Sequence, residues 1–276
     1  MKMSLILTLM CAIALLLATA AGAIEVLPNA NADDLARALV GSNQGVVIRS
    51  ASLTSVSFGT ILPTATFTNA SGTYGIGPGI VLSTGDVSKC GDGVSDDLSY
   101  SYGTSPDAET NALLAAVTGL SNHYDCTRLD IVFDLLAGYG GIRLDAVFAS
   151  EEYPRYQYTA YNDGLGVYLN GTNIAKVNHN WVNINNSEVV YLSGTAFNGA
   201  LAPGGNPLLT FTGALDAGSE SNHLTIVIGD ASDSLLDTAS YLSNLRAVSV
   251  PEPASIAFVG LGAGYVIAAL RRRVRH

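Results

Sequence analysis

Residues 129–148 read LDIVFDLLAGYGGIRLDAVF, and this stretch decides the fold class. Between 129 and 135 the large apolar side chains centre on Ile131 and Phe133 and recur at every second position. From Ile142 to Phe148 apolar side chains again occupy every second position, and glycines separate the two runs. Because successive side chains of a strand point to opposite faces, this spacing is typical of strands that bury one face. The stretch therefore predicts two consecutive β-strands.

Similar apolar runs flank this pair in both directions, separated by clusters of Gly, Asn and Ser that are typical of turns. The further strands that we predict span residues 46–53, 64–68, 79–82, 165–169, 172–177, 189–192, 208–212, 223–228 and 240–248. Two short helices are expected, one at 32–39 followed by Gly41 and one at 107–117 with Asp107 as its N-cap. The pattern predicts a mainly β fold, an antiparallel β-sandwich of jelly-roll-like form with two short helices.

Residues 1–23 have the composition of a signal peptide. Lys2 supplies a positive charge, residues 5–17 are apolar apart from Thr8, and small residues then precede Ile24. This order matches the charged, apolar and small-residue regions of signal peptides, and it predicts cleavage by signal peptidase after Ala23. An uncleaved amino-terminal membrane helix is the alternative, which the shortness of the apolar run disfavours.

Residues 250–276 contain three consecutive features. Pro251, Glu252 and Pro253 form a short motif, residues 254–270 carry no charged side chain, and residues 271–276 are rich in arginine. As a helix the uncharged stretch is roughly 26 Å long at about 1.5 Å per residue, which suffices for a transmembrane helix. The arginines should stay in the cytoplasm and leave the preceding domain outside. A buried last helix of the domain is the alternative.

Between the two ends lies one domain, residues 24–249, long enough for a substantial hydrophobic core. Residues 24–253 carry 8 basic and 23 acidic side chains, a net charge of −15, whereas the whole chain has −10. Such a surface repels nucleic acid and anionic lipid headgroups, so we expect no nucleic-acid partner. It favours solubility and divalent cations.

The three cysteines fall into two groups. Cys11 lies in the predicted signal peptide, which leaves Cys90 and Cys126 in the exported domain. An even pair in an oxidising compartment predicts a disulfide between Cys90 and Cys126. Two free buried thiols are the alternative. No Cys and His spacing in the sequence matches a zinc site.

Polar residues follow several of the predicted strands. The segment FASEEYP spans 148–154, NDG spans 162–164 and GDASDSLLD spans 229–237. If these strands are sheet neighbours, five carboxylates converge at one edge: Glu151, Glu152, Asp163, Asp230 and Asp233. Carboxylate and amide oxygens are the ligands that calcium prefers, so this cluster predicts a calcium site. The alternative is a set of turn and capping residues on a solvated acidic surface.

Two other interpretations use the same region. Glu151 and Glu152 resemble the acid and base of a glycosidase, although neighbouring strand residues point to opposite faces. The sequence has no G-x-S-x-G motif and no Ser or Cys motif near a histidine, so we do not expect an enzyme. A carbohydrate-binding module is the other interpretation, because four tyrosines offer rings that can stack on sugars: Tyr153, Tyr156, Tyr158 and Tyr161. The alternative is an ordinary loop rich in tyrosine.

The tail, with Val250-Pro251-Glu252-Pro253, the apolar span and the arginines in order, resembles the PEP-CTERM sorting signal of bacterial exported proteins. This resemblance implies recognition by an exosortase, a transpeptidase-like membrane enzyme, and cleavage near the Pro-Glu-Pro motif. It also implies a bacterium that makes extracellular polysaccharide, which would be a partner of the exported domain.

The domain itself resembles the choice-of-anchor L family. The matching segments are GIVLSTG at 79–85, FASEEY at 148–153, Asn162-Asp163 and DASDS at 230–234. One departure is Gly164-Leu165-Gly166, where a bulkier apolar residue is expected after the Asn-Asp pair. The resemblance implies a surface or matrix protein and no particular activity.

The sequence thus predicts a non-enzymatic protein of the bacterial envelope or extracellular matrix. We expect it first to be anchored at the outer face of the cytoplasmic membrane and then to reach the cell surface or the medium. Calcium would stabilise it if the carboxylate cluster binds this ion. A surface carbohydrate-binding module is the second hypothesis, and a glycosidase using Glu151 or Glu152 is the third.

Overall fold

The computed structural model describes residues 24–42, 45–55, 59–91, 99–191 and 197–249. The predicted signal peptide, the Pro-Glu-Pro motif and the predicted transmembrane helix at 254–270 lie outside these ranges. No helix in the described part of the chain combines the length and the apolar composition that crossing a membrane requires.

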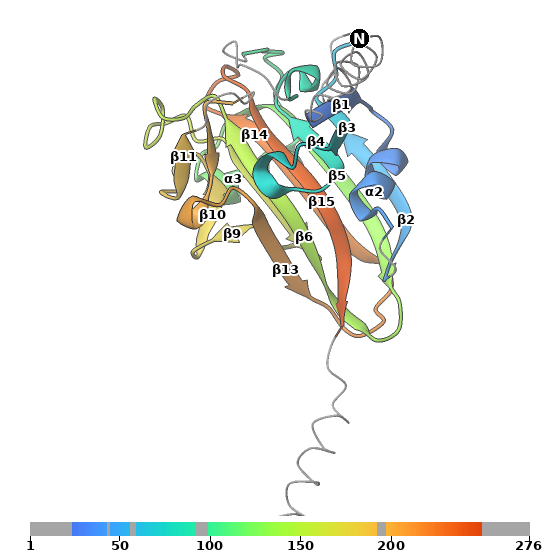
Figure 1. The fold of residues 1–276 in the computed structure, drawn as a ribbon. Helices are drawn as coiled ribbons and strands as arrows, with labels where there is room; N and C mark the ends of the chain where they lie inside the picture. The colour runs from blue at the N-terminus through green and yellow to red at the C-terminus, as the bar shows by residue number, and fades with distance from the viewer. Residues whose placement is uncertain (1–23, 43–44, 56–58, 92–98, 192–196, 250–276) are drawn as a thin grey trace, which may run out of the picture.

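The described chain forms two antiparallel sheets, which confirms the mainly β prediction (Figure 1). The first sheet has the order β1-β3-β4-β15-β6-β12-β11, with β13 also paired to β6: β1 (Ile24–Pro28), β3 (Thr64–Asn69), β4 (Gly79–Ser83), β15 (Thr238–Ser249), β6 (Tyr139–Ser150), β12 (Gly199–Leu201), β11 (Val189–Tyr191) and β13 (Leu209–Ala214). The second sheet has the order β2-β5-β14-β7-β10-β9, with β8 paired to β7: β2 (Val46–Thr54), β5 (His123–Leu135), β14 (Asn222–Ala231), β7 (Gly164–Leu169), β10 (Asn180–Asn183), β9 (Lys176–Val177) and β8 (Thr172–Asn173).

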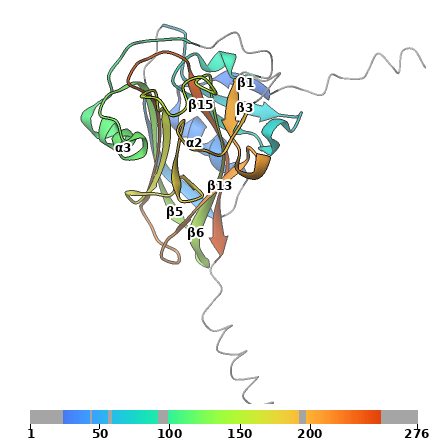
Figure 2. The same ribbon diagram turned by 90° about the vertical axis from the view of Figure 1, so that its left-hand side faces the viewer.

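The two sheets face one another across a single large core (Figure 2). Strand β5 contributes Ile131 and Phe133 to this core, and β6 contributes Leu144 and Phe148, all at most 1% exposed. These are the side chains whose period-two spacing predicted the first two strands, so that prediction is confirmed. Burying each of them contributes about 1.5–3 kcal/mol of hydrophobic stabilisation.

Two α-helices accompany the sheets, as predicted: α2 (Ala32–Val40) and α3 (Ala108–Thr118), beside short 3-10 turns η1 (Thr73–Gly75), η2 (Val87–Lys89) and η3 (Pro203–Gly205). The side chain of Asn31 accepts a hydrogen bond from the amide of Asp34 and caps α2, whose Leu35 and Leu39 enter the main core. Asp107 caps α3 by accepting from the Thr110 amide at 2.8 Å, which confirms the predicted N-cap. Helix α3 packs on β7 and β14.

The glycines of β7 make room for α3. A Cβ atom at Gly164 would lie 2.9 Å from Val117 Cγ1 of α3, and one at Gly166 would lie 2.5 Å from the ring of Tyr168. The Tyr168 hydroxyl in turn donates to the carbonyl of Leu113 in α3 at 2.6 Å. The expected bulky residue is therefore replaced here because the helix and the Tyr168 ring occupy its space.

Several strands differ from the sequence prediction. The strand expected at 172–177 is two short pieces, β8 and β9, because the Asn173 side chain accepts from the amides of both Val167 and Ala175 and turns the chain. Strands β1, β10 and β12 were not predicted. They lack a clear apolar alternation, and they are strands because β3, β7 and β6 supply their backbone partners.

The predicted disulfide is wrong in this structure, where Cys90 and Cys126 are both free and buried. Cys90 packs in a cluster with Phe67 and Tyr241, whereas Cys126 packs in a different cluster beneath α3. Burial raises the pKa of each thiol far above its ordinary value, so both stay protonated. The alternative of two free buried thiols is the one that the structure shows.

Candidate functional site

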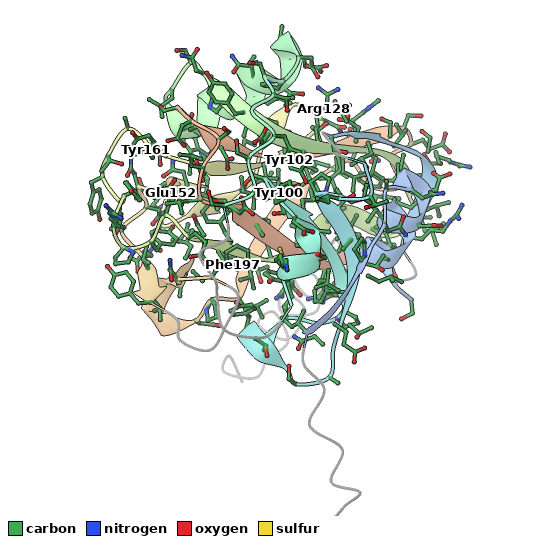
Figure 3. All side chains as sticks on the ribbon, turned by 90° about the horizontal axis from the view of Figure 1, so that it is seen from above. Tyr100, Tyr102, Arg128, Glu152, Tyr161 and Phe197 are labelled. Atoms are coloured by element: carbon green, nitrogen blue, oxygen red, sulfur yellow. The ribbon has the colours of Figure 1, made fainter. Side chains whose placement is uncertain are left out.

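The segments that resemble the choice-of-anchor L family meet at one end of the sandwich. Strands β4, β6 and β14 end there, at Ser83, Ser150 and Ala231, while β7 and β15 begin there. Figure 3 looks onto this end, which we call the pocket end, and shows Glu152 and Tyr161 on one side of it. The described chain ends at the opposite end of β15, at Ser249.

A buried carboxylate ties the two sheets together at the pocket end. Asp163 Oδ1 accepts from the amide of Ala231 at 2.9 Å, and its Oδ2 accepts from the Thr238 hydroxyl at 2.6 Å. The Thr238 and Ser150 hydroxyls lie 2.8 Å apart, and Ser150 Oγ accepts from the amide of Glu152. Asp163 thus links β14 of one sheet to β15 of the other, and its two oxygens are both engaged.

Asp230 is 1% exposed and lies close enough to Asp163 for their charges to interact. Burial, and then the charge of Asp163, raise the pKa of Asp230 well above its ordinary value, while a hydrogen bond from Thr84 opposes the shift. Burial likewise raises the pKa of Asp163. Ionising both of these buried carboxyls would place two negative charges near each other away from water, which is unfavourable. The pair therefore keeps a proton near neutral pH.

Asp237 is a buried carboxyl at the pocket end, directly before β15. Its Oδ1 accepts from the amide of Tyr100 at 2.8 Å, and burial raises its pKa to about 7. A Cβ atom at Gly85 would lie 1.9 Å from Asp237 Oδ2. Only glycine therefore fits at position 85 beside this carboxyl, which explains the glycine of the GIVLSTG segment.

Asp125 binds the backbone of residues 102–104. Its carboxylate accepts from the amides of Tyr102, Gly103 and Thr104 and from the Thr104 hydroxyl, at 2.8, 3.2, 2.9 and 3.1 Å. The residue is 1% exposed and has a φ of 47°. The Asp125 side chain thus holds the backbone of residues 102–104 in place. The same segment supplies the Tyr100 amide that donates to Asp237.

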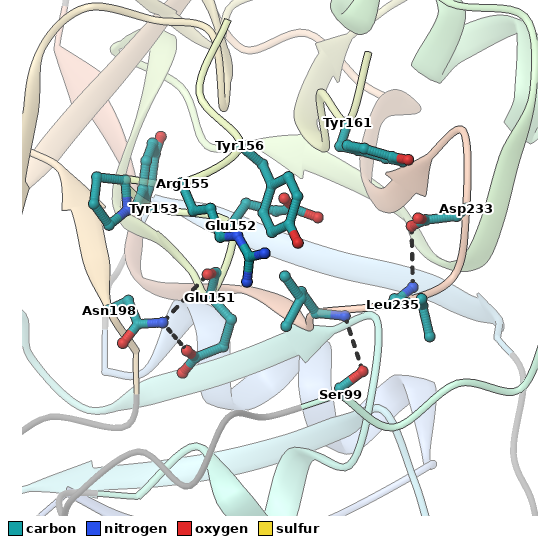
Figure 4. A pocket seen from close by; sticks show the side chains of 12 residues that line it. Ser99, Glu151, Glu152, Tyr153, Arg155, Tyr156, Tyr161, Asn198, Asp233 and Leu235 are labelled. Carbon is teal, nitrogen blue, oxygen red and sulfur yellow. Dashed lines mark hydrogen bonds between the residues drawn. The ribbon is translucent and has the colours of Figure 1, made fainter. Parts of the chain in front are cut away.

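A pocket of about 540 Å³ opens at this end (Figure 4). Its lining comes from four parts of the chain: Ser99; Glu151, Glu152, Tyr153, Pro154, Arg155, Tyr156 and Tyr161; Asn198; and Asp233, Leu235 and Leu236. The volume lies within the range of small-molecule sites, about 300–1,000 Å³. Apolar rings and polar groups both line it, which is the composition of sites that bind polar organic ligands.

The two glutamates of the pocket differ in their partners. The Asn198 amide donates to both the side-chain Oε2 and the backbone carbonyl of Glu151. Glu152 is 2% exposed, and its Oε2 has no hydrogen-bond partner among the described residues. Burial, followed by the charges of Asp163 and Asp233, raises the pKa of Glu152 to about 9. Glu152 therefore holds a proton at neutral pH while it lines an open pocket.

Two tyrosine rings form an aromatic wall of the pocket. Tyr156 and Tyr161 meet edge to face, with ring centroids 5.4 Å apart. The guanidinium of Arg155 lies 5.1 Å from the centroid of the Tyr156 ring. Of the four tyrosines proposed as a platform, these two fit the prediction best, since Tyr153 is 1% exposed and Tyr158 does not line the pocket.

The five predicted calcium ligands gather at the pocket end but do not surround one point. Glu151, Glu152 and Asp233 line the pocket, whereas Asp163 and Asp230 are buried and do not line it. Within the described ranges, no three Asp, Glu, His or Cys side chains are arranged to hold a metal ion. Calcium binding by these residues stays a prediction.

The expectation that Glu151 and Glu152 point to opposite faces fails, because both follow the last residue of β6 in a turn and both line the pocket. Sequence reasoning did not select Asp125, Asp237 or Asn198. Asp237 ends the quoted GDASDSLLD segment and could have been found there. Asp125 and Asn198 carry no sequence signal, since their partners lie far along the chain.

Comparisons with known proteins identify the family of the domain. The sequence profile of the choice-of-anchor L domain matches residues 25–245. A search among curated proteins gave no match. Among solved structures, a carbohydrate-binding module specific for non-crystalline cellulose is similar over 56% of this chain and 76% of that module, with 12% identity and a TM-score of 0.29. A similarity this weak says nothing about what the chain binds.

Proposed function

The chain belongs to the choice-of-anchor L family, which indicates a surface-associated protein, and we propose that it is a non-enzymatic protein that binds an extracellular ligand at the pocket end. The observation that carries this proposal is that two of the family's segments, FASEEY and DASDS, line one pocket, together with Tyr156 and Tyr161.

The position of the pocket suits a protein held by its tail. Strand β15 runs from the pocket end at Thr238 to Ser249, just before the Pro-Glu-Pro motif. Its 12 residues span roughly 40 Å at about 3.3 Å per residue. An anchor after Ser249 would therefore keep the domain close to the membrane and turn the pocket away from it. Export, recognition of the tail by an exosortase and a final location at the cell surface or in the extracellular matrix belong to this proposal and rest on the sequence of the two ends.

Mass spectrometry of the mature protein from cells tests the processing. We expect a chain that begins at Ile24, ends near Pro253, and adds one alkyl group at each of Cys90 and Cys126 after unfolding without a reductant. Peptide mapping assigns each group. A mass that retains residues 1–23 or 254–276 would contradict cleavage, and unmodified Cys90 and Cys126 peptides would indicate the disulfide.

The ligand class that fits the pocket best is a carbohydrate. Tyr156 and Tyr161 present rings, and Ser99, Asn198 and Asp233 present polar groups around the same opening. Rings that stack on a sugar and polar groups that bond its hydroxyls are the two elements of carbohydrate recognition. The surface carbohydrate-binding module is therefore the specific form of the proposal that the pocket favours.

Replacing the aromatic wall should abolish most of this binding. Tyr161→Ala removes one ring of the edge-to-face pair, so we expect at least about a tenfold weaker affinity, since a hot-spot side chain contributes about 1.4 kcal/mol or more. A glycan array followed by calorimetry on the best ligand measures the change. Tyr191→Ala, at a tyrosine that is 60% exposed and outside the pocket lining, is the matched control. An array that stays blank, or equal losses in both variants, would contradict the proposal.

A further inference from the structure

A second pair of aromatic rings lies beside the pocket and is not part of its lining. The centroids of the Tyr100 and Tyr102 rings are 5.2 Å apart, and Tyr100 directly follows Ser99, which lines the pocket. Figure 3 shows this pair at the pocket end, beside Glu152. Tyr100 is 37% exposed, so part of its ring is accessible to a ligand that already occupies the pocket.

Hydrogen bonds hold the backbone of Tyr100 against a wall of the pocket. Three contacts join residues 99–101 to residues 234–237: the Tyr100 amide donates to Asp237 Oδ1 at 2.8 Å, the Leu236 amide donates to Ser99 Oγ at 3.1 Å, and the Ser101 and Ser234 hydroxyls lie 2.5 Å apart. The backbone that carries the Tyr100 ring is therefore fixed next to the pocket before any ligand binds.

Leu235 continues the apolar surface from the pocket toward Tyr100. It lines the pocket, is 52% exposed and belongs to the 234–237 stretch that is bonded to residues 99–101. Tyr156 and Tyr161 form the aromatic wall of the same pocket. A contiguous set of exposed apolar side chains is typical of an interaction site on a soluble protein. The apolar surface of this site therefore extends beyond the pocket.

The polar residues among these rings indicate the kind of ligand. Ser99 and Asp233 line the pocket, and Ser101 and Ser234 lie beside the backbone of Tyr100. Ser and Asp are depleted in protein–protein interfaces relative to the rest of the surface, which disfavours a protein partner. Hydroxyls and carboxylates interleaved with aromatic rings suit sugars, whose rings stack on aromatic side chains while their hydroxyls form hydrogen bonds.

On this basis, and resting on the proposed carbohydrate function, we propose that Tyr100 forms a second sugar-binding subsite next to the pocket. Tyr156 and Tyr161 contact one sugar unit of a chain, Tyr100 stacks on another unit of the same chain, and Leu235 lies between the two. The ligand is therefore a stretch of an oligosaccharide or polysaccharide chain and not a single terminal sugar.

Calorimetry with chains of two lengths tests this subsite. The full-length protein is kept in a detergent without a sugar headgroup, and the probes are oligosaccharides of glucose, mannose, galactose and N-acetylglucosamine, each with two or six units. We expect the six-unit chain of the recognised sugar to bind at least about tenfold more tightly than its two-unit form, which is the contribution of one well-placed side chain at a binding site.

Variants assign this difference to Tyr100. Tyr100→Ala should weaken the six-unit chain about tenfold and leave the two-unit chain unchanged, whereas Tyr161→Ala should weaken both. Tyr100→Phe keeps the ring and should keep both affinities. Alanine at position 100 retains the backbone bond to Asp237, so this variant should fold, and thermal unfolding checks it. Tyr191→Ala, 60% exposed and outside the pocket lining, is the control that should change neither length.

The outcomes separate this subsite from the proposed function. Equal affinity of the unaltered protein for both lengths would overturn the subsite without any variant and would leave a carbohydrate-binding pocket. The same conclusion would follow if Tyr100→Ala weakened both lengths alike or changed neither. Binding of neither length for any of the four sugars, together with a blank glycan array, would overturn the subsite and the carbohydrate function together.

Discussion

Raising the pH from about 6.5 to about 9 should lower the free energy of unfolding of the domain by on the order of 3 kcal/mol. The cause is the set of buried carboxyls at the pocket end. Burial raises the pKa of Glu152 to about 9 and that of Asp237 to about 7. In the unfolded chain both groups ionise near pH 4, so the folded state binds more protons throughout this range. Their contribution is complete below pH about 4 and is lost as the pH passes the folded pKa values.

The pH range from about 6.5 to about 9 lies above the titration of His123, whose effect on stability is opposite to that of the carboxyls. Burial lowers the pKa of His123 to about 4, and this ring bonds to Thr118 and Asn111 as a neutral imidazole. Between pH about 4 and about 6.5 the unfolded state therefore binds the extra proton at His123, which opposes there the fall in stability that the carboxyls cause. Above pH about 6.5 this effect ends, and the slope comes from the buried carboxyls, including the Asp163 and Asp230 pair, and from pH about 8.5 also from the two buried thiols.

Urea unfolding at several pH values measures the slope. Glu152→Gln should flatten the part of the slope near pH 9, and Asp237→Asn should reduce the part near pH 7, to which Asp163 also contributes. Glu220→Gln, exposed and just before the far end of β14, should leave it unchanged. A free energy of unfolding that is constant or rises between pH about 6.5 and about 9 would show that these carboxyls are solvated.

Replacing Asp125 by alanine should destabilise the domain by about 3–5 kcal/mol, within the range for breaking a buried hydrogen-bond network. The substitution removes the acceptor for three backbone amides and one hydroxyl in residues 102–104. It also places alanine at a φ of 47°, which costs roughly 1 kcal/mol more. Because the same segment supplies the Tyr100 amide to Asp237, the loss should spread to the pocket.

Two further variants separate the causes. Asp125→Gly lacks the carboxylate but tolerates the backbone angle, so it should be about 1 kcal/mol more stable than Asp125→Ala. Asp130→Ala, on the same strand, removes a partly exposed carboxylate that bonds to Arg128 and Thr225, and it should cost only about 0.2–1 kcal/mol. Thermal unfolding of the three proteins gives the comparison. Equal losses for Asp125→Ala and Asp130→Ala would mean that the 102–104 segment does not depend on this carboxylate.

The strong strands were predictable because their own side chains decide their state. Ile131, Phe133 and Leu144 alternate so regularly that only a strand buries them together. The cap of α3 was predictable for the same local reason, since Asp107 bonds to an amide three residues away. Strands β1, β10 and β12 depend instead on partners far along the chain, which periodicity cannot detect.

The site was predictable in composition and not in arrangement. The sequence placed Glu151, Glu152 and Asp233 at strand ends, and the structure gathers them around one pocket. The sequence could not show that the two oxygens of Asp163 accept hydrogen bonds from Ala231 and Thr238, because these partners belong to two different sheets. Nor could it show that Cys90 and Cys126 enter different clusters, because that separation depends on the packing of α3.

The most direct test of the account is hydrogen exchange of the protein with and without the tightest ligand found on the glycan array. The account predicts slower amide exchange in residues 151–163 and 232–237, which surround Glu152, and unchanged exchange along the far end of β15. Slowed exchange confined to the edge strands β1 and β2, with the pocket end unaffected by a ligand that binds, would contradict it.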